Sequence, residues 1–204
     1  MEKNVEILGV VIAGGAGRRM SQDKATLQHP AADSFLHFSV GLLAQLGLEV
    51  VVSGPLKPSS ADNFVFIEDK IDHQGPLGGL NAVLCAHPDR PLLVIPVDMP
   101  ALTPEILWHM TSKLLKNKSF GRVFAHEPQS TTKEAWPFYP FPLLLSPSAL
   151  PQIQSAVKRG QWALMPFLQS LNLEIGPLME EWAPKMINVN TPEELQLFYD
   201  TPGR

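Results

Sequence analysis

Short apolar runs rich in β-branched residues alternate, in the first half of the chain, with segments whose apolar residues recur at helical spacing. The apolar runs predict four strands, at 5–13, 48–52, 63–67 and 92–97. Helical spacing predicts a helix over 34–46 that ends at Gly47, and a shorter helix over 80–86. This alternation predicts an α/β fold, with a mainly parallel sheet that carries helices on both faces.

Two Thr-Pro pairs mark the starts of further helices. At Thr103-Pro104 and Thr191-Pro192 the threonine oxygen can accept an unpaired backbone N–H, and proline suits the first helical position. Glu194 also stands where the second half of a capping box belongs. We therefore predict helices from these points to about Lys116 and to about Tyr199.

The second half of the chain has a less regular pattern. Residues 122–126 and 141–145 are apolar enough to predict two strands. The stretch between them contains Pro128, Pro137 and Pro140, which favour a hairpin-like excursion over a helix. No internal repeat or linker divides the chain.

Composition narrows the class of protein. The 204 residues suffice for one α/β domain, and 45% hydrophobic with 18% charged residues is a globular profile. The net charge of −4 argues against a nucleic-acid partner. One cysteine, Cys85, allows no internal disulfide, and no apolar run approaches the roughly 20 residues of a membrane helix. We expect a cytoplasmic protein with no membrane partner.

A glycine-rich loop follows the first predicted strand. Gly14 and Gly15 permit close approach of the backbone to a ligand, and Arg18, Arg19 and Lys24 follow them. Exposed backbone N–H groups and these cations suit a triphosphate, so the loop predicts a phosphate cradle. The spacing is neither that of a P-loop nor G-x-G-x-x-G, and a simple turn is the alternative.

Carboxylates follow two other predicted strands. Asp98 comes directly after 92–97, where a single carboxylate suffices for Mg²⁺ that also binds water and substrate phosphates. The alternative is an aspartate that caps the turn before Pro100. Asp69 precedes Gly78 and Gly79, which could admit a flat base or ribose close to the backbone, or could simply form a tight turn.

Taken together, these motifs resemble those of the molybdenum cofactor guanylyltransferase family. The matching segments, in the family's order and at about its spacing, are 12–15 with 18–20 and 23–24, then 75–79, 96–100 and 188–193. The resemblance spans about residues 5–198, is close in the first half, and is thin over about 118–187. It implies a Rossmann-like nucleotidyltransferase fold, with a nucleotide-binding half at 1–117 and an acceptor-binding half at 118–204.

The resemblance also implies an activity: transfer of GMP from GTP to the phosphate of the molybdopterin cofactor, with Mg²⁺ and with release of pyrophosphate. It implies catalytic roles for Lys24, Arg18, Arg19 and Asp98, the last of which would hold the metal. The residues implied to bind nucleotide are Ile12, Ala13, Gly14, Gly15, Lys24, Ser53, Asp69, Gly78, Gly79 and Asp98. Asn188 and Asn190 match the acceptor side, and transient contacts with molybdenum-insertion or molybdoenzyme-maturation proteins are implied as well.

Three positions depart from the family pattern. Ser53 stands where asparagine is common, Trp136 replaces the histidine of a His-Pro pair, and Trp162 lies where a basic segment is expected. These departures keep alternatives open: cytidylyl transfer to molybdopterin, nucleotidyl transfer to a sugar phosphate, or a nucleotide-binding module without transfer activity. The two tryptophans could stack on a pterin or pack in the core. The six histidines lack paired spacing, which argues against a zinc site.

Overall fold

A sheet of seven strands, in the order β3-β2-β1-β4-β6-β5-β7, forms the centre of the structure. The strands are β1 (Leu8–Ile12), β2 (Glu49–Gly54), β3 (Val65–Glu68), β4 (Leu92–Pro96), β5 (Gly121–Phe124), β6 (Leu143–Leu145) and β7 (Leu173–Gly176). β6 runs antiparallel to both neighbours, and the other strand pairs are parallel. This computed structural model describes residues 6–13, 23–54, 64–69, 75–113, 115–126 and 137–201.

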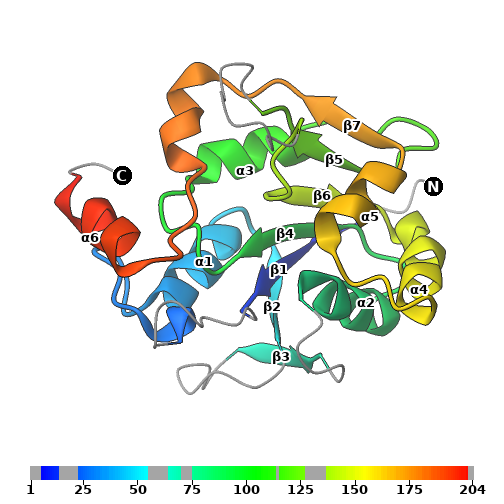
Figure 1. Cartoon of the computed structure of the whole chain (residues 1–204), viewed down its shortest axis with the longest axis horizontal. Coiled ribbons are helices and arrows are strands. Elements are labelled where there is room, and N and C mark those ends of the chain that lie inside the picture. The colour runs from blue at the N-terminus through cyan, green and yellow to red at the C-terminus, as the bar shows by residue number, and fades with distance from the viewer. Residues whose placement is uncertain are drawn as a thin grey trace.

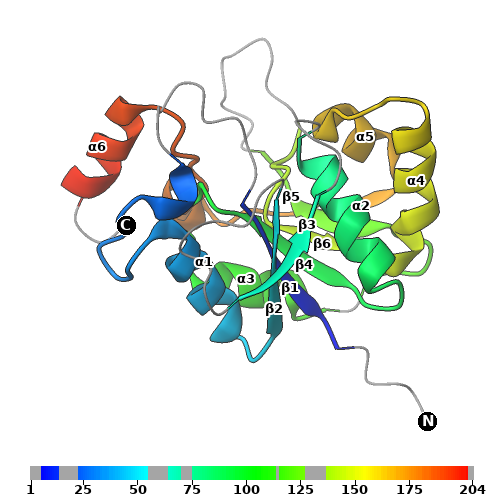
Figure 2. The same cartoon turned by 90° about the horizontal axis from the view of Figure 1, so that it is seen from below.

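Helices cover both faces of the sheet, as the sequence predicted (Figure 1). They are α1 (Phe35–Ala44), α2 (Pro76–Ala86), α3 (Pro104–Thr111), α4 (Leu150–Lys158), α5 (Leu164–Ser170) and α6 (Pro192–Asp200). α1 and α3 lie on one face, whereas α2 packs beside α4 on the other (Figure 2). α6 lies apart from these layers, next to the blue segment that precedes α1 (Figures 1 and 2).

The central strands are buried because both faces of the sheet are covered. Every residue of β1 and of β4 is buried, and Val10 of β1 lies between Val51 of β2 and Val94 of β4 in register. Strands covered on both faces have continuous apolar sequences, which explains why β1 and β4 were predicted. β2 and the edge strand β3, which is exposed or half-buried, were also predicted and are found. Their observed ends differ from the predicted ones by at most three residues.

The starts of α1, α3 and α6 follow local sequence, whereas α2 begins at Pro76, four residues before its predicted start, and some helix ends depend on tertiary contacts. Thr191 and Glu194 form the predicted capping box of α6. Thr103 occupies the N-cap position of α3, but its side chain makes no capping hydrogen bond. α3 ends at Thr111, short of the predicted end near Lys116. The guanidinium of Arg122 donates to the carbonyls of Met110 and Lys113, at 2.8 Å each, and these bonds satisfy the carbonyls at the helix end.

In the second half, the two predicted strands are found as β5 and β6, which pair antiparallel. A bridge between Ala125 and Phe138 extends this pairing toward the predicted hairpin, whose residues 127–136 lie outside the described part of the chain. α4, α5 and β7 were not predicted. α4 buries Ile153 and Ala156, a short apolar stripe at helical spacing that the surrounding polar residues and prolines obscure.

We expect two glycine substitutions to have opposite effects on stability. A Cβ at Gly121 would lie 2.5 Å from the carbonyl oxygen of Leu144 on the neighbouring strand, so Gly121→Ala must push β5 and β6 apart. We expect it to lower the free energy of unfolding by about 2 kcal/mol, as overpacking does. At Gly41, inside α1, a Cβ meets nothing within 4 Å, so Gly41→Ala should raise stability by about 0.5 kcal/mol.

Urea unfolding of both variants and of the unmodified chain measures the difference. Equal stability of the two variants would contradict the contact between Gly121 and β6.

Candidate functional site

The candidate site lies at the point in the sheet where the strand order reverses, between β1 and β4. β2 and β3 extend the sheet on one side of β1, and the chain then crosses back to add β4 on the other side. In open α/β sheets such a switch point leaves a crevice beyond the carboxyl ends of the two strands, and ligands bind there. Here it lies at the carboxyl ends of β1 and β4.

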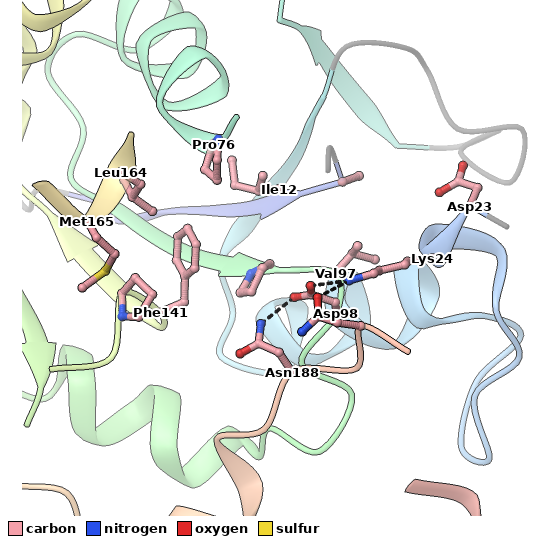
Figure 3. A pocket seen from close by; sticks show the side chains of 14 residues that line it. Ile12, Asp23, Lys24, Pro76, Val97, Asp98, Phe141, Leu164, Met165 and Asn188 are labelled. Carbon is pink, nitrogen blue, oxygen red and sulfur yellow. Dashed lines mark hydrogen bonds and ion pairs between the residues drawn. The ribbon is translucent and has the colours of Figure 1, made fainter. Parts of the chain in front are cut away.

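A cavity of about 340 Å³ occupies this position (Figure 3). It is lined by Ile12, Ala13, Asp23, Lys24, Pro76, Pro96, Val97, Asp98, Pro140, Phe141, Leu164, Met165, Asn188 and Asn190. Lys24, Asp98 and Asn188 gather at one end, whereas Phe141, Leu164 and Met165 lie at the other (Figure 3). The cavity therefore has a polar end and an apolar wall.

Four residues singled out in the sequence meet at the polar end. Lys24 Nζ donates to Asp98 Oδ2 at 2.8 Å and to Asn190 Oδ1 at 2.6 Å. Asn188 Nδ2 donates to the other carboxylate oxygen of Asp98, Oδ1, at 2.9 Å. The structure thus brings together residues that lie 74, 166 and 90 positions apart in these pairs.

Backbone contacts hold the segments that carry these side chains. Lys24 opens a 3-10 helix, Lys24–Thr26, for which the Asp23 carboxylate provides the N-cap by accepting from the N–H of Ala25 at 3.0 Å. Asp98 follows β4, and its carbonyl accepts the N–H of Val189 at 2.8 Å. That bond places the 188–190 segment across the end of β4, so both asparagines face Asp98 and Lys24.

The polar end contains a partly buried ion pair, formed by the ammonium group of Lys24 and the carboxylate of Asp98. The side chains of Lys24 and Asp98 are 14% and 18% exposed, so solvent screens their attraction less than it would on an open surface. An ammonium group has three N–H donors. Two of them point to Asp98 and Asn190, and within the described ranges of the chain the third remains for an anionic ligand.

Asp98 also fits a divalent cation. Mg²⁺ binds proteins through one or two carboxylates and takes its other ligands from water and substrate phosphates. Each Asp98 oxygen accepts one hydrogen bond from the residues described above and keeps a further lone pair that a cation can use. Asp23 adds a second carboxylate to the lining. Among the residues that the structure describes, no group of three or more His, Cys, Asp or Glu side chains could hold a metal.

Four of the predicted nucleotide-binding residues, Ser53, Asp69, Gly78 and Gly79, form a buried cluster at the start of α2. The hydroxyl of Ser53 is fully buried and lies 3.5 Å from the carbonyl of Gly79. A Cβ at Gly78 would lie 2.7 Å from Asp69 Oδ1, and one at Gly79 would lie 3.1 Å from Ser53 Oγ. In this structure both glycines serve the close packing of α2, while direct contact of these four residues with a base stays a prediction.

Several predicted residues lie outside the described part of the chain: Gly14, Gly15, Arg18 and Arg19 of the glycine-rich loop, and Trp136. Ile12 and Ala13, which precede that loop, line the cavity.

Sequence reasoning missed the apolar wall of the cavity. Phe141 precedes β6, and Leu164 and Met165 begin α5, so no local motif connects them with the glycine-rich loop. Their position depends on how β6 pairs with β4 and how the following helices fold back over the sheet. The only available signal was their place in the half of the chain that the resemblance assigns to the acceptor.

A buried histidine connects the Lys24 segment with the turn that carries Asp98. His29 Nε2 donates to the carbonyl of Pro100 at 2.9 Å, and its Nδ1 accepts the N–H of Ala31 at 3.0 Å. The ring stacks on Phe38, with 3.8 Å between ring centroids. Burial lowers the pKa of the imidazole below its ordinary value of 6.5, and the bond to Pro100 opposes this only in part.

Comparison with known proteins gives one family model and relatives along the whole chain. Residues 9–173 match the model of the MobA-like NTP transferase domain. A protein of Opitutus terrae named "Probable molybdenum cofactor guanylyltransferase" is 29% identical over 95% of this chain and 96% of that protein. A Pelotomaculum thermopropionicum protein of the same name is 33% identical over 52% of each chain. This chain therefore matches about half the length of the Pelotomaculum protein. The match with the Opitutus protein runs nearly from end to end of both chains.

Solved structures show the same fold. The molybdopterin-guanine dinucleotide biosynthesis protein A of Archaeoglobus fulgidus superposes with a TM-score of 0.74 at 22% identity, over 94% of this chain and 96% of that one. The 2-C-methyl-D-erythritol 4-phosphate cytidylyltransferase of Thermus thermophilus gives a TM-score of 0.66 at 19% identity, over 94% and 96%. Within the described residues, no helix is long and apolar enough to cross a membrane.

The buried His29 predicts a specific pH dependence of stability. Because its pKa is lower in the folded chain than in the unfolded chain, the unfolded chain binds the additional proton first as the pH falls. His29 therefore contributes its full stability above the ordinary pKa of 6.5, and this contribution declines as the pH falls from 6.5 toward the folded pKa.

Urea unfolding of the unmodified chain and of His29→Gln, between pH 7.5 and pH 5, measures this contribution. We expect a steeper loss of stability with falling pH in the unmodified chain. Parallel pH profiles would contradict the assignment.

Proposed function

The chain belongs to the MobA-like NTP transferase family, and from this premise we propose that it transfers GMP from GTP to a phosphate of the molybdopterin cofactor. An oxygen of the acceptor phosphate forms a bond to the α-phosphorus of GTP. The bond from that phosphorus to the oxygen bridging the β-phosphate breaks, and pyrophosphate leaves with the electron pair. Relatives that carry the guanylyltransferase name over nearly the whole chain support this choice of donor and acceptor.

The observation that carries the proposal is the contact of Lys24, Asp98 and Asn190 at the switch point of the sheet. Transfer between phosphates requires positioning and charge neutralisation rather than a covalent nucleophile. Lys24 would exchange part of its contact with Asp98 for the oxygens of the triphosphate and of the leaving pyrophosphate. Mg²⁺ held by Asp98 would supply a second positive charge for the same phosphates. Arg18 and Arg19 are the further cations that the sequence offers.

The acceptor would enter from the side formed by the second half of the chain. Asn188 and Asn190 provide amide groups at the polar end, and Phe141, Leu164 and Met165 provide an apolar wall. A planar heterocycle that carries a phosphate has matching parts, because its ring favours the apolar wall and its phosphate the polar end. An attacking phosphate is already anionic at neutral pH, so a general base is unnecessary.

We place this reaction in the cytoplasm, with transient contacts to the proteins that insert molybdenum or receive the product. The single cysteine, suited to a reducing compartment, supports the location.

Removal of either charge should abolish most of the transfer. With GTP, Mg²⁺ and molybdopterin cofactor, we expect Lys24→Ala and Asp98→Ala to lower the rate of pyrophosphate release by at least about 100-fold, as loss of a positioned electrostatic group does. Lys116→Ala and Asp89→Ala are matched controls, since these exposed residues precede β5 and β4 at the opposite edge of the sheet. Near-normal rates in either test variant would contradict the assigned role.

Nucleotide preference tests the donor. Isothermal titration with GTP, CTP, ATP and UTP in the presence of Mg²⁺ should show tightest binding of GTP. The test needs the CTP arm because a cytidylyltransferase shares this fold. Preference for CTP would overturn guanylyl transfer, whereas GTP binding without pyrophosphate release above the Asp98→Ala level would indicate a binding module.

A further inference from the structure

The C-terminal helix α6 contacts the Lys24 segment at both of its ends. α6 lies outside the two helical layers and next to the described residues 23–34, which precede α1 (Figures 1 and 2). A helix that only completed the core would bury a full apolar stripe, but Phe198 is the buried residue of α6. Leu195, in the middle of the helix, packs against the core only in part, whereas hydrogen bonds to the rest of the chain lie at the two ends of α6.

At the N-terminal end, the capping box fixes the backbone next to Lys24. Glu194 Oε2 accepts the N–H of Asn190 at 2.6 Å and the N–H of Thr191 at 3.0 Å. Thr191 Oγ1 accepts the N–H of Glu194 at 3.2 Å in return. Asn190, thus held, presents its Oδ1 to the ammonium of Lys24 at 2.6 Å. A chain of two hydrogen bonds connects Glu194 with Lys24.

At the C-terminal end, α6 holds the chain four and five residues beyond Lys24. The Tyr199 hydroxyl donates to the carbonyl of Gln28 at 2.8 Å. The Phe198 ring lies 5.5 Å from the ring of His29, measured between centroids, and His29 in turn donates to the carbonyl of Pro100. The same segment is thereby attached to α6 and to the turn that follows Asp98.

We propose that α6 is a positioning element for Lys24, with Glu194 acting through Asn190 and Tyr199 acting through Gln28. A lysine side chain has four rotatable carbon bonds and binds as a point charge, so its backbone and its neighbours must restrict the ammonium position. A small displacement of a positioned group lowers a transfer rate strongly. The inference rests on the proposed function, in which the ammonium group of Lys24 binds the phosphates of a nucleoside triphosphate.

A double-mutant cycle separates positioning from simple helix stability. We expect Glu194→Ala to lower kcat about fivefold and to weaken GTP binding about threefold, because Asn190 loses its anchor. In the Asn190→Ala background the same change should have less than about a twofold effect, because the connection to Lys24 is already broken. Glu194→Gln keeps an acceptor for both N–H groups and should restore most of the activity.

Glu193→Ala is the matched control, because it removes the same charge from the same helical turn at an exposed position. It should leave kcat and GTP affinity unchanged. Tyr199→Phe removes only the hydroxyl that binds Gln28 and should weaken GTP binding about twofold without loss of the fold, since the ring remains. Melting temperatures of all variants show whether the chain is folded in each assay.

Equal effects of Glu194→Ala in the two backgrounds, or an equal loss in Glu193→Ala, would overturn the positioning role. GTP affinity is measured separately from transfer. The double-mutant cycle can therefore be evaluated from the dissociation constants of GTP alone, and it decides this inference even if no pyrophosphate is released. Absence of release in the unmodified chain would contradict the proposed function alone.

Discussion

A partly buried ammonium group requires polar partners, and the arrangement around Lys24 meets this requirement. Removing an ammonium from water is costly unless a carboxylate or other acceptors replace the lost hydration. Asp98 supplies the opposite charge and Asn190 a neutral acceptor, while Asn188 binds the second oxygen of Asp98. The pair is thus oriented by its neighbours, which lowers the cost of organising it when an anionic ligand arrives.

The topology of the sheet explains why these residues can meet. β1 lies between β2 and β4, and the crossing from β3 to β4 opens a crevice at the carboxyl ends of β1 and β4. The antiparallel β6 lies on the other side of β4, so the chain that precedes it delivers Phe141 to this same edge. The later bond between Val189 N–H and the Asp98 carbonyl brings the C-terminal segment back to the crevice. Both halves of the chain therefore contribute to one cavity.

The ends of some helices depend on residues close in the sequence, whereas others depend on tertiary contacts. The capping box at Thr191 and Glu194 and the left-handed Gly47 in the turn after α1 were predictable, because each depends on residues within a few positions. The end of α3 was not, since Arg122 from β5 donates to the carbonyl of Met110 in the last turn and to that of Lys113 just beyond the helix. α5 was missed for a different reason: its seven residues carry no N-cap hydrogen bond from a side chain, so no local signal marks its start.

The sequence by itself determined the strands of the first half, the starts of α1 and α6, and the order of the motifs that contain Lys24, Asp98 and Asn190. These features follow from spacing and from side chains that act on their own backbone. Only the tertiary structure decided that Lys24 binds Asn190 across 166 positions, that Asp69 packs against Gly78, and that Leu164 and Met165 wall the cavity. Such contacts depend on strand order and helix packing, which are determined by the free energies of interaction of many distant residues. The residues that meet therefore show no local sequence pattern.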